Sequence, residues 1–120
     1  MSIIFDQSFH EIKPFTFHEI LRLRIDIFVV EQNCPYPELD GFDVDSETRH
    51  IWIEEKESPV SYLRVLRSSE GIYRIGRVAT ALNNRHKGMA QSLIEHVIKT
   101  TSGELVLDAQ TYLENWYKEM

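Results

Sequence analysis

The sequence has 120 residues, of which 42% are hydrophobic and 27% are charged, and this composition is typical of a single globular domain spanning residues 1–120. Thirteen basic against nineteen acidic residues give a formal net charge of −6, so nucleic acid and anionic membranes are poor candidates for the main partner, because both favour basic surfaces. Cys34 is the single cysteine, so an intrachain disulfide is excluded. The sequence has no apolar run of membrane-spanning length and no signal-peptide pattern, and we therefore expect a cytoplasmic protein.

The N-terminal part of the chain predicts a strand and then a helix. Weak alternation over Ser8–Lys13 indicates a first strand, which Pro14 ends. Thr16 and Glu19 have the spacing of a capping box, and we therefore expect a helix over residues 17–30. The face of this helix that should be buried carries Ile20, Leu23, Ile27 and Val30.

Residues 31–47 are expected to form a loop or at most a broken helix. Two prolines restrict the backbone there, and a high density of carboxylates opposes a compact helix. Beyond this loop, apolar patterns predict strands over residues 50–55, 60–67 and 73–80, joined by turns at Lys56–Pro59 and Ser68–Gly71.

The C-terminal part predicts a helix, a strand and another helix. Residues 91–100 have helical spacing, residues 104–109 form a short buried strand, and residues 111–120 begin the last helix. The apolar face of the first of these helices carries Leu93, Ile94, Val97 and Ile98. The complete order, β-α-β-β-β-α-β-α, predicts an α/β (α+β) fold with helices packed on a mixed sheet.

The segment between Thr80 and the helix at residues 91–100 has the features of an anion site. A helix that begins near Gly88 turns its unpaired N–H donors and the positive end of its dipole toward the preceding loop. Gly88 and Ala90 keep side chains away from these donors, while Arg85 and Lys87 supply positive charge. The same small residues also fit a tight turn that lets helix and strand pack closely, and the spacing alone does not decide between the two.

The segment Arg85–Ala90, Arg-His-Lys-Gly-Met-Ala, matches the Arg/Gln-x-x-Gly-x-Gly/Ala signature, and in this respect the chain resembles the GNAT superfamily of N-acetyltransferases. Residues 21–43, LRLRIDIFVVEQNCPYPELDGFD, are similar to the ElaA-like branch of that superfamily, as are the later stretches TRHI, YLRVL and LVLDAQTYLENWYKEM. The resemblance extends from Phe17 to Met120 and implies a GNAT fold with acetyl-CoA as the co-substrate.

The resemblance also implies where the cofactor binds. The loop Arg85–Ala90 would take the pyrophosphate of acetyl-CoA, and the strand edge at Val78–Thr80 would pair with the pantetheine arm. Gln110 stands where many relatives carry an asparagine, so this contact departs from the family pattern. The expected cofactor-binding residues are Val78, Ala79, Thr80, Arg85, His86, Lys87, Gly88, Met89, Ala90, Gln91 and Gln110.

The implied reaction moves an acetyl group from the thioester to an amine. A base or a water chain must take the amine's proton, and N–H donors near Val78–Thr80 would stabilise the oxyanion. Tyr117 falls where the family carries the tyrosine that protonates the leaving thiolate. Tyr117 can equally be a core aromatic residue of an amphipathic helix.

The loop after the first helix is expected to border the acceptor pocket. Its carboxylates would attract a cationic amine, and Glu31 and His50 are the candidate bases. The expected substrate-binding residues are Glu31, Gln32, Asp40, Asp43 and His50. A solvated acidic loop is the alternative interpretation, and the acceptor can be a small molecule or a peptide amine.

A metal site is a rival interpretation of the same loop. Asp43, Asp45, Glu47 and Glu54 fall at positions 1, 3, 5 and 12 of a calcium-loop template. Thr48 occupies the position that requires glycine, and a strand-like pattern follows where a helix belongs. We therefore expect no metal.

The relatives usually continue past Met120 with further strands, so we expect a C-terminally short domain whose open sheet edge can pair with a second copy in a homodimer. Two alternatives to an active N-acetyltransferase stay open. One is a degenerate GNAT domain that binds CoA or a partner protein without turnover, and the other is an activity like that of acyl-homoserine-lactone synthases. The intact Arg85–Ala90 loop and Tyr117 favour the acetyltransferase.

Overall fold

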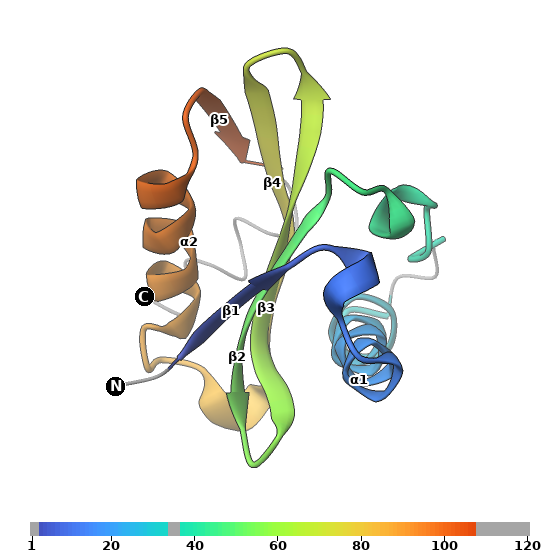
Figure 1. The fold of residues 1–120 in the computed structure, drawn as a ribbon. Helices are drawn as coiled ribbons and strands as arrows, with labels where there is room; N and C mark the ends of the chain where they lie inside the picture. Colours follow the sequence, from blue (N-terminus) through green and yellow to red (C-terminus); the bar gives the residue numbers. More distant parts are fainter. Residues whose placement is uncertain (1–2, 34–36, 108–120) are drawn as a thin grey trace.

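The computed structural model describes residues 3–33 and 37–107, and it confirms the predicted mixed α/β fold. Five strands lie in the order β1-β2-β3-β4-β5, with three antiparallel pairings followed by a parallel pairing of β4 with β5. Helix α1 covers one face of this sheet and α2 covers the other (Figure 1). The elements are β1 (Ile4–Gln7), α1 (Pro14–Ile25), β2 (Arg49–Glu55), β3 (Ser58–Ser69), β4 (Ile72–Thr80), α2 (Met89–Thr100) and β5 (Glu104–Leu107).

The first strand lies earlier than predicted, and the assignment of Ser8–Lys13 to a strand is wrong. β1 begins at Ile4, which lies opposite Ile53 of β2 in an antiparallel pair. Ser8 instead begins a short 3-10 turn, in which the Glu11 carboxylate accepts hydrogen bonds from the Ser8 backbone N–H (2.8 Å) and from its Oγ (3.2 Å). These side-chain bonds satisfy polar groups of the turn locally and so end the strand.

Helix α1 begins at Pro14, so the capping box predicted at Thr16 and Glu19 is also wrong. Proline has no N–H to leave unpaired, and its fixed φ already matches a helix, which makes it well suited to the first helical position. Thr16 consequently lies inside the first turn of the helix.

Helix α1 continues into a π-helical turn, η2 (Asp26–Glu31), which changes the buried face. Ile27 is buried as predicted, but Val30 is 66% exposed, while Phe28 is only 1% exposed. The backbone N–H of Gln32 donates to the carbonyl of Ile27, five residues back, at 3.2 Å. A π turn holds more residues than an α turn, so the 3.6-residue spacing no longer predicts which side chains face the sheet.

Helix α2 buries a stripe slightly different from the predicted one. Leu93 and Val97 are fully buried and Ile94 is partly buried, but Ile98 is 58% exposed and was wrongly placed on the buried face. A helix rotates by about 100° per residue, so Ile98 faces away from the sheet once Val97 points into it. The buried stripe extends instead into the first turn of the helix, where Ala90 is buried.

The hairpin of β3 and β4 contains a β-bulge next to its centre. Tyr62 lies opposite Ala79 and Arg64 lies opposite Gly76, so two residues of β4 face a single residue of β3. Arg77, one of the two, has a φ of +54°, which is uncommon for a residue with a side chain. The bulge removes one residue from the ladder and bends the strand.

β5 follows only the first half of β4. The parallel pairs run from Ile72 with Glu104 to Ile75 with Leu107. Within the described parts of the chain, no strand lies beside Gly76–Thr80 on the β5 side of the sheet.

Candidate active site

The loop between β4 and α2 presents an open helix N-terminus. Gly88, the residue before α2, has a φ of +75°, and a methyl group added to it would meet no atom within 4 Å. A left-handed φ suits glycine, and the first N–H groups of a helix have no partners inside the helix. This arrangement is able to bind an anion.

The neighbouring positions contribute backbone or exposed side chains. Met89 and Ala90 are buried against the sheet, so close packing explains the small size of Ala90. His86 and Gln91 are exposed, and His86 has a left-handed φ of +67°. The anion-binding character of this loop therefore resides in Gly88 and the helix backbone, together with nearby cations.

Arg85 connects the loop to two other elements. Its guanidinium donates to both carboxylate oxygens of Glu31, at 2.6 and 2.7 Å, and its Nε donates to the backbone carbonyl of Thr80 at 3.0 Å. The predicted base Glu31 is thus brought beside the predicted cofactor loop. The Arg85 side chain is largely buried, whereas Glu31 remains partly exposed at the surface.

The side chains of Val78, Ala79 and Thr80 are all buried, so this part of β4 can offer a ligand only its backbone. Val78 packs in the cluster on the α2 side of the sheet, and Ala79 packs on the α1 side. The Thr80 hydroxyl is hydrogen-bonded to the Ser61 hydroxyl at 2.9 Å.

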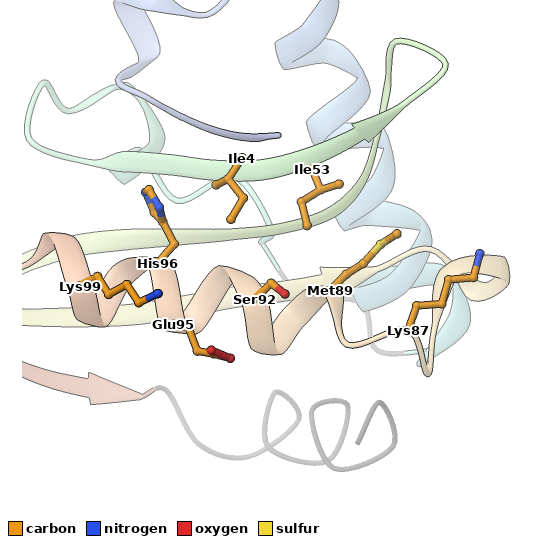
Figure 2. Close-up of a pocket in the computed structure, with 8 residues that line it drawn as sticks. All are labelled: Ile4, Ile53, Lys87, Met89, Ser92, Glu95, His96 and Lys99. Atoms are coloured by element: carbon orange, nitrogen blue, oxygen red, sulfur yellow. The ribbon is translucent and has the colours of Figure 1, made fainter. Parts of the chain in front are cut away.

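A cavity of about 490 Å³ runs along the flank of α2 that faces β1 (Figure 2). Ile4 and Ile53 point into it from the strands, Lys87 and Met89 lie at one end, and Lys99 lies toward the other. Lys87 therefore adds positive charge close to the N-terminus of α2, where the helix dipole is also positive.

Arg24, which was not among the predicted site residues, binds the loop that follows η2. It has no exposed surface, and it donates to Glu38 at 2.5 Å and to Asp43 at 2.8 Å. Burial by itself would lower the pKa of Arg24, but the neighbouring Tyr62 and Asp43 raise it by a larger amount. The net effect is a raised pKa, so the guanidinium stays charged. Its position four residues after Ile20, on the apolar face of the helix, was a signal that could have revealed it.

Asp40 is bound by two more arginines. Its carboxylate accepts a short hydrogen bond from Arg64 and a 3.3 Å hydrogen bond from Arg77. Burial raises the pKa of Asp40, but the hydrogen bonds from Arg64 and from the backbone N–H of Phe42 outweigh this effect and lower it to about 2. Arg64 also donates to the buried Asp43 at 3.0 Å, so neither carboxylate presents free negative charge to a cationic amine.

His50, the other predicted base, lies in the core with no exposed surface. One ring nitrogen, Nε2, donates to the backbone carbonyl of Asp43 at 2.9 Å, which leaves Nδ1 to accept from the Tyr62 hydroxyl at 2.7 Å. Burial lowers the pKa of His50, which favours the neutral ring. In this position the ring cannot take a proton from an amine at the surface.

Gln32 is half-buried at the end of η2, and Tyr117 and Gln110 lie outside the described residues. Across the described ranges, no group of three or more histidine, cysteine, aspartate or glutamate side chains could hold a metal ion. No helix in these ranges combines the length and the apolar character needed to cross a membrane.

The chain is similar in sequence to several known proteins. It is 39% identical over 107 residues to a UPF0039 protein of Mycobacterium tuberculosis, a match that covers 85% of this chain and 69% of that protein. It is 32% identical over 120 residues to the protein ElaA of Escherichia coli, a match that covers 94% of this chain and 78% of ElaA. No family model matches the chain.

Two solved structures share its fold closely. The crystal structure of Escherichia coli ElaA matches with a TM-score of 0.86, over 98% of this chain and 84% of that one. An acyl-CoA N-acyltransferase of Pseudomonas aeruginosa, 29% identical, matches with a TM-score of 0.85 over 98% of this chain and 85% of that one. The chain is therefore a member of the ElaA-like branch of the GNAT superfamily and has the fold of acyl-CoA N-acyltransferases.

Proposed function

We propose that the protein is an N-acetyltransferase that uses acetyl-CoA and acts on a small-molecule or peptide amine. The observation that carries this proposal is the open N-terminus of α2 at Gly88, at the end of the loop that follows β4, the strand whose ladder with β3 is interrupted by a bulge. The pyrophosphate would accept hydrogen bonds from the first N–H groups of α2, where the helix dipole is positive. Lys87 adds a cation to the same loop.

The second half of β4 would hold the reactive end of the cofactor. The amide groups of the pantetheine arm are able to pair with the backbone of Val78–Thr80 in the manner of an added strand. The bulge at Arg77 interrupts the ladder with β3 next to this segment, and a backbone N–H of Val78–Thr80 would stabilise the oxyanion of the tetrahedral intermediate.

Two proton transfers complete the proposed mechanism. Glu31 takes the proton of the attacking amine, directly or through water, because it is a partly exposed carboxylate beside the cofactor loop and each of its oxygens has a second lone pair besides the one that accepts from Arg85. Tyr117 donates a proton to the departing thiolate, an assignment that rests on the family resemblance. His50 has no part in these transfers because both of its ring nitrogens are bonded inside the core.

The test is a calorimetric titration with acetyl-CoA of the parent protein and of two glycine variants. Gly88 and Gly71 both have a φ of +75° and open space at the position of a Cβ, so a glutamate introduces the same charge and a comparable strain at either site. We expect Gly88→Glu to abolish binding, because the side chain and its charge oppose the phosphates, and Gly71→Glu to retain it.

Equal binding of acetyl-CoA by Gly88→Glu and the parent would show that the anion site is assigned incorrectly. The release of free thiol from acetyl-CoA is then measured over a panel of amines. Binding without thiol release for any amine would indicate a CoA-binding domain that does not turn over.

A further inference from the structure

Arg77, the bulge residue of β4, has a backbone conformation that is unusual for a residue with a side chain. Among the non-glycine residues with a left-handed φ in residues 3–33 and 37–107, only Arg77 lies within a strand, and the others lie in turns or loops. A left-handed φ costs free energy in most residues other than glycine, because the Cβ comes too close to the backbone. Such conformations persist where the surrounding contacts hold them, and they are concentrated at functional sites.

The side chain of Arg77 is held by the loop that follows η2. Its Nε donates to the Glu38 carboxylate at 3.0 Å, and its Nη2 donates to the backbone carbonyl of Glu38 at 3.1 Å and to the Asp40 carboxylate at 3.3 Å. Arg77 and Glu38 are both buried, so these bonds are stronger than they would be at the surface. The guanidinium is a rigid planar fork of donors, so the bonds fix its orientation as well as its position. We call these bonds to Glu38 and Asp40 the Arg77 clamp.

Glu38 is itself held in place by Arg24 of α1. The Nε of Arg24 donates to the same carboxylate oxygen of Glu38 that Arg77 binds, at 2.5 Å, and its Nη2 donates to the backbone carbonyl of Glu38 at 3.2 Å. Arg24 has no exposed surface. The bulge is therefore tied through Glu38 to the buried face of a helix as well as to a loop.

We infer that Arg77 is a positioning residue of the proposed reaction. The clamp holds the left-handed backbone at the bulge, and this backbone aims the N–H groups of Val78–Thr80 at the thioester. The peptide bond is planar, so the two backbone dihedrals of Arg77 decide where the N–H of Val78 points. A donor stabilises an oxyanion only at about 2.7–3.1 Å from it, so a small change of direction matters. The inference rests on the proposed function for the reaction, while the hold of the clamp on the bulge can be tested alone.

The first experiment compares Arg77→Ala with Arg77→Gly. Both variants remove the clamp, but glycine adopts a left-handed φ without strain and alanine does not. We expect Arg77→Ala to lower kcat for thiol release from acetyl-CoA by roughly 10–10³-fold, the upper limit being the loss of an oxyanion donor. Arg77→Gly should have a kcat at least roughly fivefold above that of Arg77→Ala, because its backbone can return to the bulge conformation. The affinity for acetyl-CoA, measured by calorimetry, should fall far less than kcat, because the pyrophosphate site at Gly88 is unchanged.

Arg67 provides the matched control. It lies on β3 in the same hairpin, forms a surface ion pair with Glu47 at 2.8 Å, and does not have a left-handed φ. Arg67→Ala and Arg67→Gly should both keep a kcat close to that of the parent. Urea denaturation should show Arg67→Gly to be the less stable of the two, because glycine weakens a strand. Rescue by glycine at residue 77 but not at residue 67 would therefore report the backbone conformation and not a general effect of glycine.

Two kinetic results would overturn the inference. An equal loss of kcat in Arg77→Ala and Arg77→Gly would show that the guanidinium acts in some way other than through the backbone φ. A parent-like kcat in Arg77→Ala would show that the N–H groups need no clamp. If neither variant folds, Arg77→Lys decides, because it keeps a positive charge beside Glu38 but lacks the planar fork. We expect its kcat to fall as well, and a parent-like kcat would again overturn the inference.

A second experiment separates failure of this inference from failure of the proposed function. The amide NMR signals of Val78–Thr80 are recorded in the parent and in the three variants of Arg77. We expect them to move furthest from the parent in Arg77→Ala and less in Arg77→Gly. If the parent releases no thiol from acetyl-CoA with any amine, the proposed function fails, and these signals decide about the clamp. Signals that stay at the parent positions in every folded variant, or that move equally in Arg77→Ala and Arg77→Gly, would overturn it.

Discussion

The buried ion pairs of Arg24 allow a prediction whose size follows from the structure. Arg24→Met keeps a long apolar stem but leaves Glu38 and Asp43 without the cation that they share. Removing one partner of a buried ion pair costs about 3–5 kcal/mol in the free energy of unfolding. Arg77 still donates to Glu38 and Arg64 still donates to Asp43, each at 3.0 Å. We therefore expect the lower end of this range, about 3 kcal/mol.

Urea denaturation at neutral pH measures this loss, and calorimetry should show a fall in Tm of roughly 10 °C for a domain of this size. The control is Arg67→Met, which breaks the exposed ion pair of Arg67 with Glu47 and should cost less than about 1 kcal/mol. If Arg24→Met lost no more stability than Arg67→Met, burial would not be what makes the Arg24 pairs strong, and the reasoning would be refuted.

Three further predictions follow from the helix register, from the ion pairs and from the proposed chemistry. Phe28 is buried and Val30 is exposed. Phe28→Ala should therefore lower the free energy of unfolding by about 3–5 kcal/mol, and Val30→Ala by less than about 0.5 kcal/mol. The reverse order in urea denaturation would contradict the π-helical register. Burial raises the pKa of Asp40, but the bond from Arg64 lowers it from 3.8 to about 2. Its contribution to stability is therefore complete above about pH 4 and is lost as the pH falls toward 2, and Asp40→Asn should flatten the pH dependence of unfolding. Tyr117→Phe should preserve folding and acetyl-CoA affinity but lower kcat by roughly 10²–10⁴-fold, and full activity would remove Tyr117 from the mechanism.

Local patterns in the sequence determine most of the order of the helices and strands. They also determine the position of the glycine before α2. Apolar stretches separated by turn residues predicted β2, β3 and β4 closely, because both signals are local to each strand. The first strand was misplaced because the weak apolar–polar alternation over Ser8–Lys13 was taken for a strand. In the structure Ser8 and Glu11 form a hydrogen-bonded turn there. Gly88 could be placed before a helix because glycine has no side chain and readily adopts the left-handed φ found at that position, whatever packs around it.

Only the tertiary structure decided which side chains meet. Glu38 lies 14 residues from Arg24 and 39 residues from Arg77, and no spacing in the sequence couples such distant positions. The acidic loop suggested an attractor for a cationic amine, whereas in the fold Asp40 and Asp43 are bonded to arginines, because charges at buried positions require partners. The bulge at Arg77 and the π turn at η2 likewise depend on how strands and helices align with one another. A periodic pattern describes each element separately and carries no information about that alignment.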